Sequence, residues 1–302
     1  METFYLILVV VLFGLAISDL MVGVSNDAVN FLNSAIGAKA APFKIIMLVA
    51  ALGVLVGATF SSGLMEVARK GIFHPGQFYF SEIMIIFLAV MITDVILLDM
   101  FNTFGLPTST TVSIVFELLG GAVAISTLKI LSSPETFSDL DKYINSSNAL
   151  MIIFGILLSV VVAFTIGAIV QYLARMMFTF NYRKNLKYFG ALWGGIALTA
   201  ITYFMLIKGA KGASFMDDSL KVAIHDYQWV IVGISFIFWT GLFQVLSMAV
   251  KKFNILKTIV LVGTFALAMA FAGNDLVNFI GVPLAGYESF LAFREAPNAD
   301  PN

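Results

Sequence analysis

The 302-residue chain contains no cysteine, which excludes disulfide bonds, thiolate catalysis and cysteine-ligated metal sites. It has two histidines, His74 and His225, which are far apart and lie in polar connections, so neither suggests a catalytic or metal site. Charged residues make up 12% of the chain, roughly half the usual share of soluble domains. No basic stripe is interleaved with aromatic residues, and we therefore expect no nucleic-acid partner.

Hydrophobic residues are abundant instead, at 60% of the chain with a mean hydropathy of +0.98. The apolar runs are too long for the short alternating strands of a β-barrel. They predict an all-α integral membrane protein, multi-pass in the plasma (inner) membrane, with about eight transmembrane helices. The first run has no basic residues before it and no small-residue cleavage site after it, so we expect it to be a retained span. The predicted spans cover residues 4–24, 43–64, 80–101, 110–131, 149–173, 189–207, 229–250 and 258–272.

One six-residue motif occurs twice, each time at the trailing end of an apolar run. Asn-Asp-x-Val-Asn-Phe stands at 26–31 and again at 274–279. Polar side chains at membrane depth are costly and usually functional, so two copies predict one central site built by a duplicated unit. Interhelical hydrogen bonding between packed spans is the alternative for a single copy.

Seven predicted spans separate the two copies, and this odd number makes them face opposite ways across the membrane. That parity predicts inverted-topology repeats, the organisation from which alternating access is commonly built. We assign residues 1–131 to the first repeat, 132–250 to intervening helices and loops, and 251–302 to the start of a second, incomplete repeat. Basic clusters at 175–187 and 251–257 predict the cytoplasmic side, while Arg69 and Lys70 dissent from simple alternation.

Each motif supplies hard oxygen ligands of the kind that small cations prefer. Asp27 and Asn30 lie three residues apart, so in a helix both point to one face, with Asn26 beside them. Small and polar neighbours predict that the helix is broken here, which would free backbone carbonyls for a cation. The second copy offers Asn274, Asp275 and Asn278.

A second polar element, Gly-Leu-Pro-Thr-Ser-Thr-Thr at 105–111, lies between two apolar runs and predicts a re-entrant or broken segment. The hydroxyls of Ser109, Thr110 and Thr111, with the free N–H groups of a helix start, would donate to an oxyanion. A plain capped helix start explains the element equally well.

Four more acids lie at membrane depth, and the sequence assigns none of them a firm role. They are Asp19, Asp94, Asp99 and Glu117. Asp94 and Asp99 stand five residues apart, which is poor geometry for one helical face. Each is a candidate cation or proton group, or a hydrogen-bonding partner of a neighbouring helix.

These motifs resemble the inorganic phosphate transporter (PiT) family, which carries a duplicated Gly-Ala-Asn-Asp-Val-Ala-Asn signature and a Gly-Leu-Pro-Val-Ser-Thr-Thr element. The resemblance runs from about Phe4 to Gly286 and implies a secondary transporter that imports inorganic phosphate with sodium or protons. It implies that phosphate meets Asp27, Asn30, Ser109, Thr110, Thr111, Asp275 and Asn278. It implies further that sodium binds the Asn-Asp motifs through Asn26, Asp27, Asn30, Asn274, Asp275 and Asn278.

The chain departs from the family pattern at several points. Ser25, Val29 and Val277 replace smaller residues of the signature, and Val112 stands where many members have histidine. A second Pro-x-Ser-Thr element, which the family places after the second aspartate motif, does not occur before Asn302. We therefore expect a C-terminally truncated chain, whose tail from Glu288 begins an external loop.

Competing functions remain open on the sequence alone. A permease for sulfate or another oxyanion would use the same fold, whereas a channel fits inverted repeats less well. A membrane-embedded enzyme would need a nucleophile–base pair or a metal cluster at depth, and the sequence offers neither, so we expect no catalytic residues and no cofactor. The expected partners are phosphate, the coupling cation and the lipid bilayer, and a homo-oligomer is left open.

Overall fold

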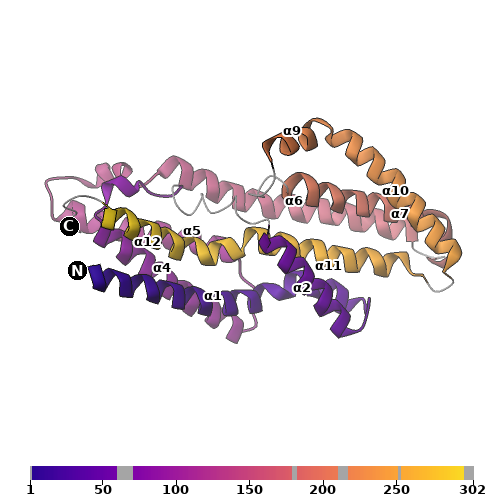
Figure 1. The fold of residues 1–302 in the computed structure, drawn as a ribbon, viewed down its shortest axis with the longest axis horizontal. Coiled ribbons are helices and arrows are strands. Elements are labelled where there is room, and N and C mark those ends of the chain that lie inside the picture. The colour runs from indigo at the N-terminus through magenta and orange to yellow at the C-terminus, as the bar shows by residue number, and fades with distance from the viewer. Residues whose placement is uncertain (1, 60–70, 179–181, 210–216, 251–252, 296–302) are drawn as a thin grey trace. The chain divides into compact units, whose positions relative to one another are not determined.

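The computed structural model describes residues 2–59, 71–178, 182–209, 217–250 and 253–295, and these residues are almost entirely helical (Figure 1). Short helical turns cover Pro75–Gln77, Phe137–Lys142 and Phe204–Gly209. The longer helices are α1 (Glu2–Gly37), α2 (Phe43–Thr59), α4 (Phe80–Thr103), α5 (Thr110–Leu131), α6 (Ser146–Phe178), α7 (Tyr182–Tyr203), α9 (Asp218–Asp226), α10 (Gln228–Ala249), α11 (Ile255–Asn274) and α12 (Leu276–Glu295).

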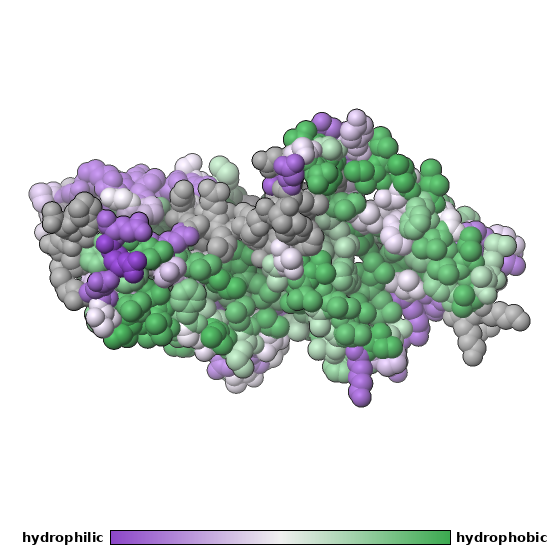
Figure 2. All heavy atoms as spheres, viewed as in Figure 1, coloured by the Kyte–Doolittle hydropathy of each residue, from purple (hydrophilic) through white to green (hydrophobic). Residues whose placement is uncertain are grey.

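Within these described ranges, seven helical stretches are long and apolar enough to cross a membrane, the last of them joining α11 and α12. A helix satisfies every backbone polar group internally, which the bilayer core requires. Large apolar side chains stay exposed along the helices, and green hydrophobic atoms cover much of the face in Figure 2. The prediction of an all-α integral membrane protein is confirmed. The predicted span at 43–64 corresponds to α2, whose 17 residues fall just short of this length.

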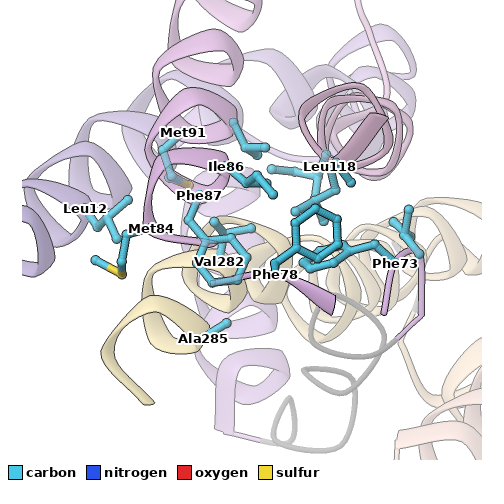
Figure 3. Close-up of a cluster of buried hydrophobic side chains, with 14 of the residues drawn as sticks. Leu12, Phe73, Phe78, Met84, Ile86, Phe87, Met91, Leu118, Val282 and Ala285 are labelled. Carbon is cyan, nitrogen blue, oxygen red and sulfur yellow. The ribbon is translucent and has the colours of Figure 1, made fainter. Parts of the chain in front are cut away.

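Two compact units make up the chain, and each is described by itself. The first comprises residues 1–29, 64–157 and 274–302. Its hydrophobic core is contributed by α1, α4, α5 and α12, together with Phe73 and Phe78 from the segment before α4 (Figure 3). Leu12, Met84, Met91 and Leu118 are fully buried in this core, and Val282 of α12 is 1% exposed. Asp27 of α1, Thr110 and Thr111 of α5 and Asn278 of α12 lie on these helices, so this packing holds the candidate site residues in place.

The α4–α5 hairpin in this unit is closed at its far end by an ion pair. The Lys129 ammonium lies 2.8 Å from the Glu82 carboxylate and 4.2 Å from the centre of the Tyr79 ring. The same carboxylate accepts a hydrogen bond from the Tyr79 backbone N–H, which caps the start of α4. The charges of Lys129 and Glu82 are therefore compensated by each other and by Tyr79.

A polar connection between α5 and α6 carries its own charge network. Asp139 accepts a hydrogen bond from the backbone N–H of Thr136 and lies 3.0 Å from the Lys142 ammonium. The backbone hydrogen bond, and then the lysine, lower the pKa of the Asp139 carboxyl. This segment is exposed, as its predicted position outside the membrane requires.

The second unit comprises residues 30–63 and 158–273. In it, α2 packs on α11 at Gly53 and Gly57, where any Cβ atom would collide with backbone oxygens of α11. Small residues of this kind let membrane helices approach closely. The α7–α10 pair packs in the same way, with Gly194 against the buried ring of Phe243 and Gly195 against Thr240.

Two local predictions are wrong. The first motif does not break its helix, because α1 continues from Glu2 to Gly37 without interruption. The tail from Glu288 does not begin a loop, because α12 continues to Glu295 and buries Phe290 in the core of the first unit. Arg69, Lys70, Lys251 and Lys252 lie outside the described residues. The repeat boundaries and the orientation in the membrane stay predictions.

Gly23 of α1 permits the closest approach to α12, and its replacement by alanine is expected to destabilise the first unit. A Cβ atom here would overlap the ring of Phe279, which is fully buried and cannot turn aside. Overpacking of this kind costs about 1–3 kcal/mol. Thermal unfolding in detergent should show a lower Tm for Gly23→Ala, whereas Gly14→Ala on the same helix, with no atom within 4 Å of its Cβ, should not. Equal Tm values for the two variants would contradict this packing.

Candidate functional site

The start of α5 is built by residues 104–109, which form a tight turn after α4. Gly105 adopts a positive φ of 66°, a conformation that glycine tolerates without strain. Ser109 is the N-cap, and its Oγ accepts a hydrogen bond from the Val112 backbone N–H at 3.3 Å. The capped helix start predicted for this element is therefore present. Thr110 and Thr111 occupy the first turn, where backbone N–H groups have no helical acceptor.

Asn26 of the first motif holds this turn against α1. Its side-chain amide donates to Asn102 Oδ1 at 2.9 Å and to the Leu106 carbonyl at 3.1 Å, and its oxygen accepts from the Thr108 N–H at 2.8 Å. Asn102 in turn donates to the carbonyl of Val22 at 2.9 Å. Asn26 is 5% exposed, so these bonds are made away from solvent. This asparagine positions the helix start that bears Ser109, Thr110 and Thr111.

The second motif does break its helix. Helix α11 ends at Asn274 and α12 begins at Leu276, with Asp275 as the turn residue between them. The Asp275 carbonyl accepts a hydrogen bond from the Asn278 N–H at 3.1 Å, which closes the first turn of α12. The same six-residue pattern therefore gives a continuous helix in one copy and a helix start in the other.

Thr111 joins the two helix starts. Its hydroxyl donates to Asp275 Oδ1 at 2.9 Å and accepts from the Asn278 side-chain amide at 2.9 Å. The Thr111 hydroxyl has one proton, and the hydrogen bond to Asp275 uses it. The N-termini of α5 and α12 consequently lie next to each other.

Asp27 completes the group. Its carboxyl is 4% exposed and hydrogen-bonds with the side chain of Thr110, which is 1% exposed. It lies close enough to Asp275 for the two carboxylates to repel each other. Each aspartate thus has one threonine of the α5 start as a partner, and the two acids share one region.

The basic side chains in the described part of the first unit lie away from the start of α5. The lysines and arginines there are Lys129, Lys142 and Arg294. Lys129 is bound to Glu82 and lies eighteen residues beyond Thr111 along α5, about 27 Å away. The positive contributions at the site are the two helix N-termini, each worth roughly half an elementary charge.

Most of the predicted site residues meet here. Asp27, Thr110, Thr111, Asp275 and Asn278 come together, and Ser109 and Asn26 support them. Asn274 is the last residue of α11, and Asn30 is the first residue of the second unit. Sequence analysis missed Asn102, whose only signal was an amide at the end of an apolar run, three residues before Gly105.

Two relatives resemble the chain over most of its length. The chain is 27% identical to a predicted phosphate permease of Thermococcus kodakarensis over 295 residues, which cover 95% of this chain and 67% of that protein. It is 25% identical to a predicted phosphate permease of Pyrococcus furiosus, over 93% of this chain and 66% of that protein. The chain therefore spans about two thirds of the length of these relatives.

A solved structure described as the sodium-dependent phosphate transporter has the same fold. It superposes with a TM-score of 0.65 at 20% sequence identity, over 99% of this chain and 71% of that one. The model of the phosphate transporter family, a family of transporters and not of enzymes, matches residues 23–298. This match includes both Asn-Asp motifs and the Pro-Thr-Ser-Thr-Thr element, and the chain belongs to the phosphate transporter family.

Proposed function

We propose that this protein imports inorganic phosphate together with a cation, and that Na⁺ is the coupling ion. The observation that carries the proposal is the meeting of two aspartates with two helix N-termini at Thr110 and Thr111. Helix N-termini and hydroxyls favour an oxyanion, whereas the carboxylates oppose it. A site with both features suits an anion that arrives with a cation.

The charges at the site support the binding of sodium before phosphate. Asp27 and Asp275 lie close enough for their charges to interact, so an added anion meets repulsion from two acidic side chains when both are ionised. A sodium ion bound by the aspartates, with oxygens of Asn30, Asn274 and Asn278 as further predicted ligands, would remove most of this repulsion. Phosphate would then accept hydrogen bonds from Ser109 and from the free N–H groups of α5, beside Thr110 and Thr111, whose hydroxyls bond to the two aspartates.

Phosphate is favoured over sulfate for a chemical reason. Phosphate near neutral pH carries a proton and can donate a hydrogen bond, whereas sulfate cannot. A carboxylate beside the anion accepts that bond from phosphate and repels sulfate. Asp27 is bonded to Thr110, and Asp275 to Thr111, at the helix start proposed for the anion, which supports phosphate as the substrate.

The transport cycle that we propose uses the two motifs as halves of one site in inverted repeats. Sodium binds first and lowers the negative charge, phosphate follows, and the repeats rearrange so that the site opens to the other side. The Thr111–Asp275 hydrogen bond joins the two halves, so a change at one helix start reaches the other.

Radiolabelled phosphate uptake into proteoliposomes tests the function. We expect an inward sodium gradient to drive phosphate above its equilibrium level, and an equal potassium gradient to fail. Unlabelled sulfate in excess should leave the uptake unchanged. Competition by sulfate but not by phosphate would contradict phosphate as the substrate. Equal uptake with sodium and with potassium would contradict sodium as the coupling ion.

A further inference from the structure

A cluster of three acids lies inside the first unit, apart from the Asn-Asp motifs. Asp94 of α4 and Glu117 of α5 both contact the hydroxyl of Ser113, and Asp19 of α1 lies near these two acids. Asp19 and Asp94 are 0% exposed and Ser113 is 8% exposed. Carboxylates so deeply buried at membrane depth are costly unless a partner neutralises them.

The hydrogen bonds of Ser113 require a proton on one of these acids. Its Oγ lies 2.5 Å from Asp94 Oδ1 and 2.8 Å from Glu117 Oε1. A serine hydroxyl has one proton and can donate to only one carboxylate. The other contact is a hydrogen bond only if the carboxyl itself carries a proton and donates to Oγ.

The surroundings of Asp19 also require a bound proton. Neither of its carboxyl oxygens has a hydrogen-bond donor, and Asp94 Oδ2 and Glu117 Oε2 also lack one. The side chains of Asp19 and Asp94 nevertheless lie within interaction distance of each other. Two carboxyl groups in that position attract each other only when a proton lies between them.

No other charge on the surrounding helices satisfies the cluster. Lys129 on α5 is bound to Glu82, and Asp99 on α4 is exposed. On α12, Tyr287, Glu288 and Arg294 are exposed as well. Among the described residues no group of three or more acids or histidines has the arrangement of a metal site, which favours protons over a metal ion.

We propose that Asp19, Asp94 and Glu117 form a proton-binding site that takes up and releases a proton during transport. The inference rests on the proposed function, because transport supplies the change that would expose the cluster. A carboxylate would take a proton from water on one side of the membrane and return it to water on the other side. Ser113 would bond to both Asp94 and Glu117 in the protonated state, and to only one of them after the proton has left.

The position of the cluster couples it to the phosphate site. Ser113 follows Thr111 by two residues on α5, and Asp19 precedes Asp27 by eight residues on α1, about 12 Å along the helix. A movement of either helix that opens the phosphate site therefore changes the packing around the cluster. Protonation in turn biases the conformation in which the acids are buried.

Infrared spectroscopy of the purified protein tests proton binding without transport. The carbonyl stretch of protonated carboxylic acids should persist at neutral pH in the unchanged protein. It should weaken in Asp19→Asn, Asp94→Asn and Glu117→Gln, whose amides mimic the protonated acids and preserve the fold. Asp99→Asn, an exposed acid of α4, should leave the band unchanged. Absence of the band at neutral pH, or the same band in all three variants, would overturn the site.

Proteoliposomes test whether the proton is exchanged. At a fixed sodium gradient, acidification outside should accelerate phosphate uptake by the unchanged protein and by Asp99→Asn, but not by Glu117→Gln or Asp94→Asn. Acceleration that persists in both cluster variants would overturn the exchange. If the unchanged protein takes up no phosphate, the proposed function fails, while the infrared result still decides whether the cluster holds protons.

Discussion

Replacement of Asp275 by asparagine is expected to lower phosphate uptake by roughly tenfold or more. Asp275 accepts a hydrogen bond from Thr111 at 2.9 Å. Asparagine can still accept this bond, but a bond to a neutral group is weaker by about 1–1.5 kcal/mol than a bond to a charged group, which is roughly tenfold. The asparagine also removes the charge that we propose for sodium binding. Initial rates of sodium-driven uptake in proteoliposomes measure the effect, with Asp99→Asn as the matched control. Uptake by Asp275→Asn or Asp27→Asn at the unchanged rate would contradict the assignment of the site.

A double-mutant cycle separates the hydrogen bond from the charge. Thr111→Val keeps the shape of the side chain and removes the hydroxyl that joins Asp275 to the Asn278 amide. If Asp275 and Thr111 act as one unit, the double variant should lose little more phosphate uptake than the more strongly impaired single variant. The effects of substitutions at residues in contact are not additive. Losses that add in full would show that the two residues act independently.

The fold was largely predictable because lipid limits the options of the backbone. Long apolar runs at membrane depth must be helical, and the predicted runs correspond to α1, α2, α4, α5, α6, α7, α10 and α11. The C-terminal helix α12 was missed because its residues are mixed in polarity. Its buried residues Val282, Ala285, Gly286 and Phe290 do follow helical spacing, so the signal was present in the sequence.

The site was predictable where polar residues recur in a motif, and unpredictable where they pair through space. The Asn-Asp repeat and the hydroxyl element identified Asp27, Thr111 and Asp275. The Asn26–Asn102 pair spans 76 positions and leaves no periodic trace in the chain.

The backbone conformation at the two motifs could not be predicted from their local sequence either. The same residues continue a helix at Asp27 and interrupt one at Asp275, so tertiary packing decides between the two outcomes. One difference lies on the C-terminal side of each motif. Pro283 inside α12 leaves the carbonyl of Phe279 without its helical donor, whereas α1 has no proline after the first motif.

Substitution of Asn26 tests which of two roles it has: binding a cation or positioning the start of α5. The sequence could not distinguish these roles. Asn26→Leu leaves the Thr108 N–H, the Leu106 carbonyl and the Asn102 amide without their partner, and each such buried group costs about 1–3 kcal/mol. We therefore expect a markedly lower Tm and a large loss of phosphate uptake. Ser25→Ala is the matched control, because that exposed hydroxyl bonds only to the Met21 carbonyl of its own helix.

Asn102→Leu then decides between the roles. Asn102 bonds to Asn26 and to the Val22 carbonyl, and nothing assigns it to a cation. If Asn26 acts by positioning, both leucine variants should weaken phosphate uptake together, and the sodium concentration for half-maximal uptake should shift equally in the two. A rise in that concentration confined to Asn26→Leu would instead make Asn26 a sodium ligand. The three hydrogen bonds of the Asn26 amide use both of its donors and one of the two lone pairs of its oxygen, and all three go to the turn before α5 or to Asn102, which favours the positioning role.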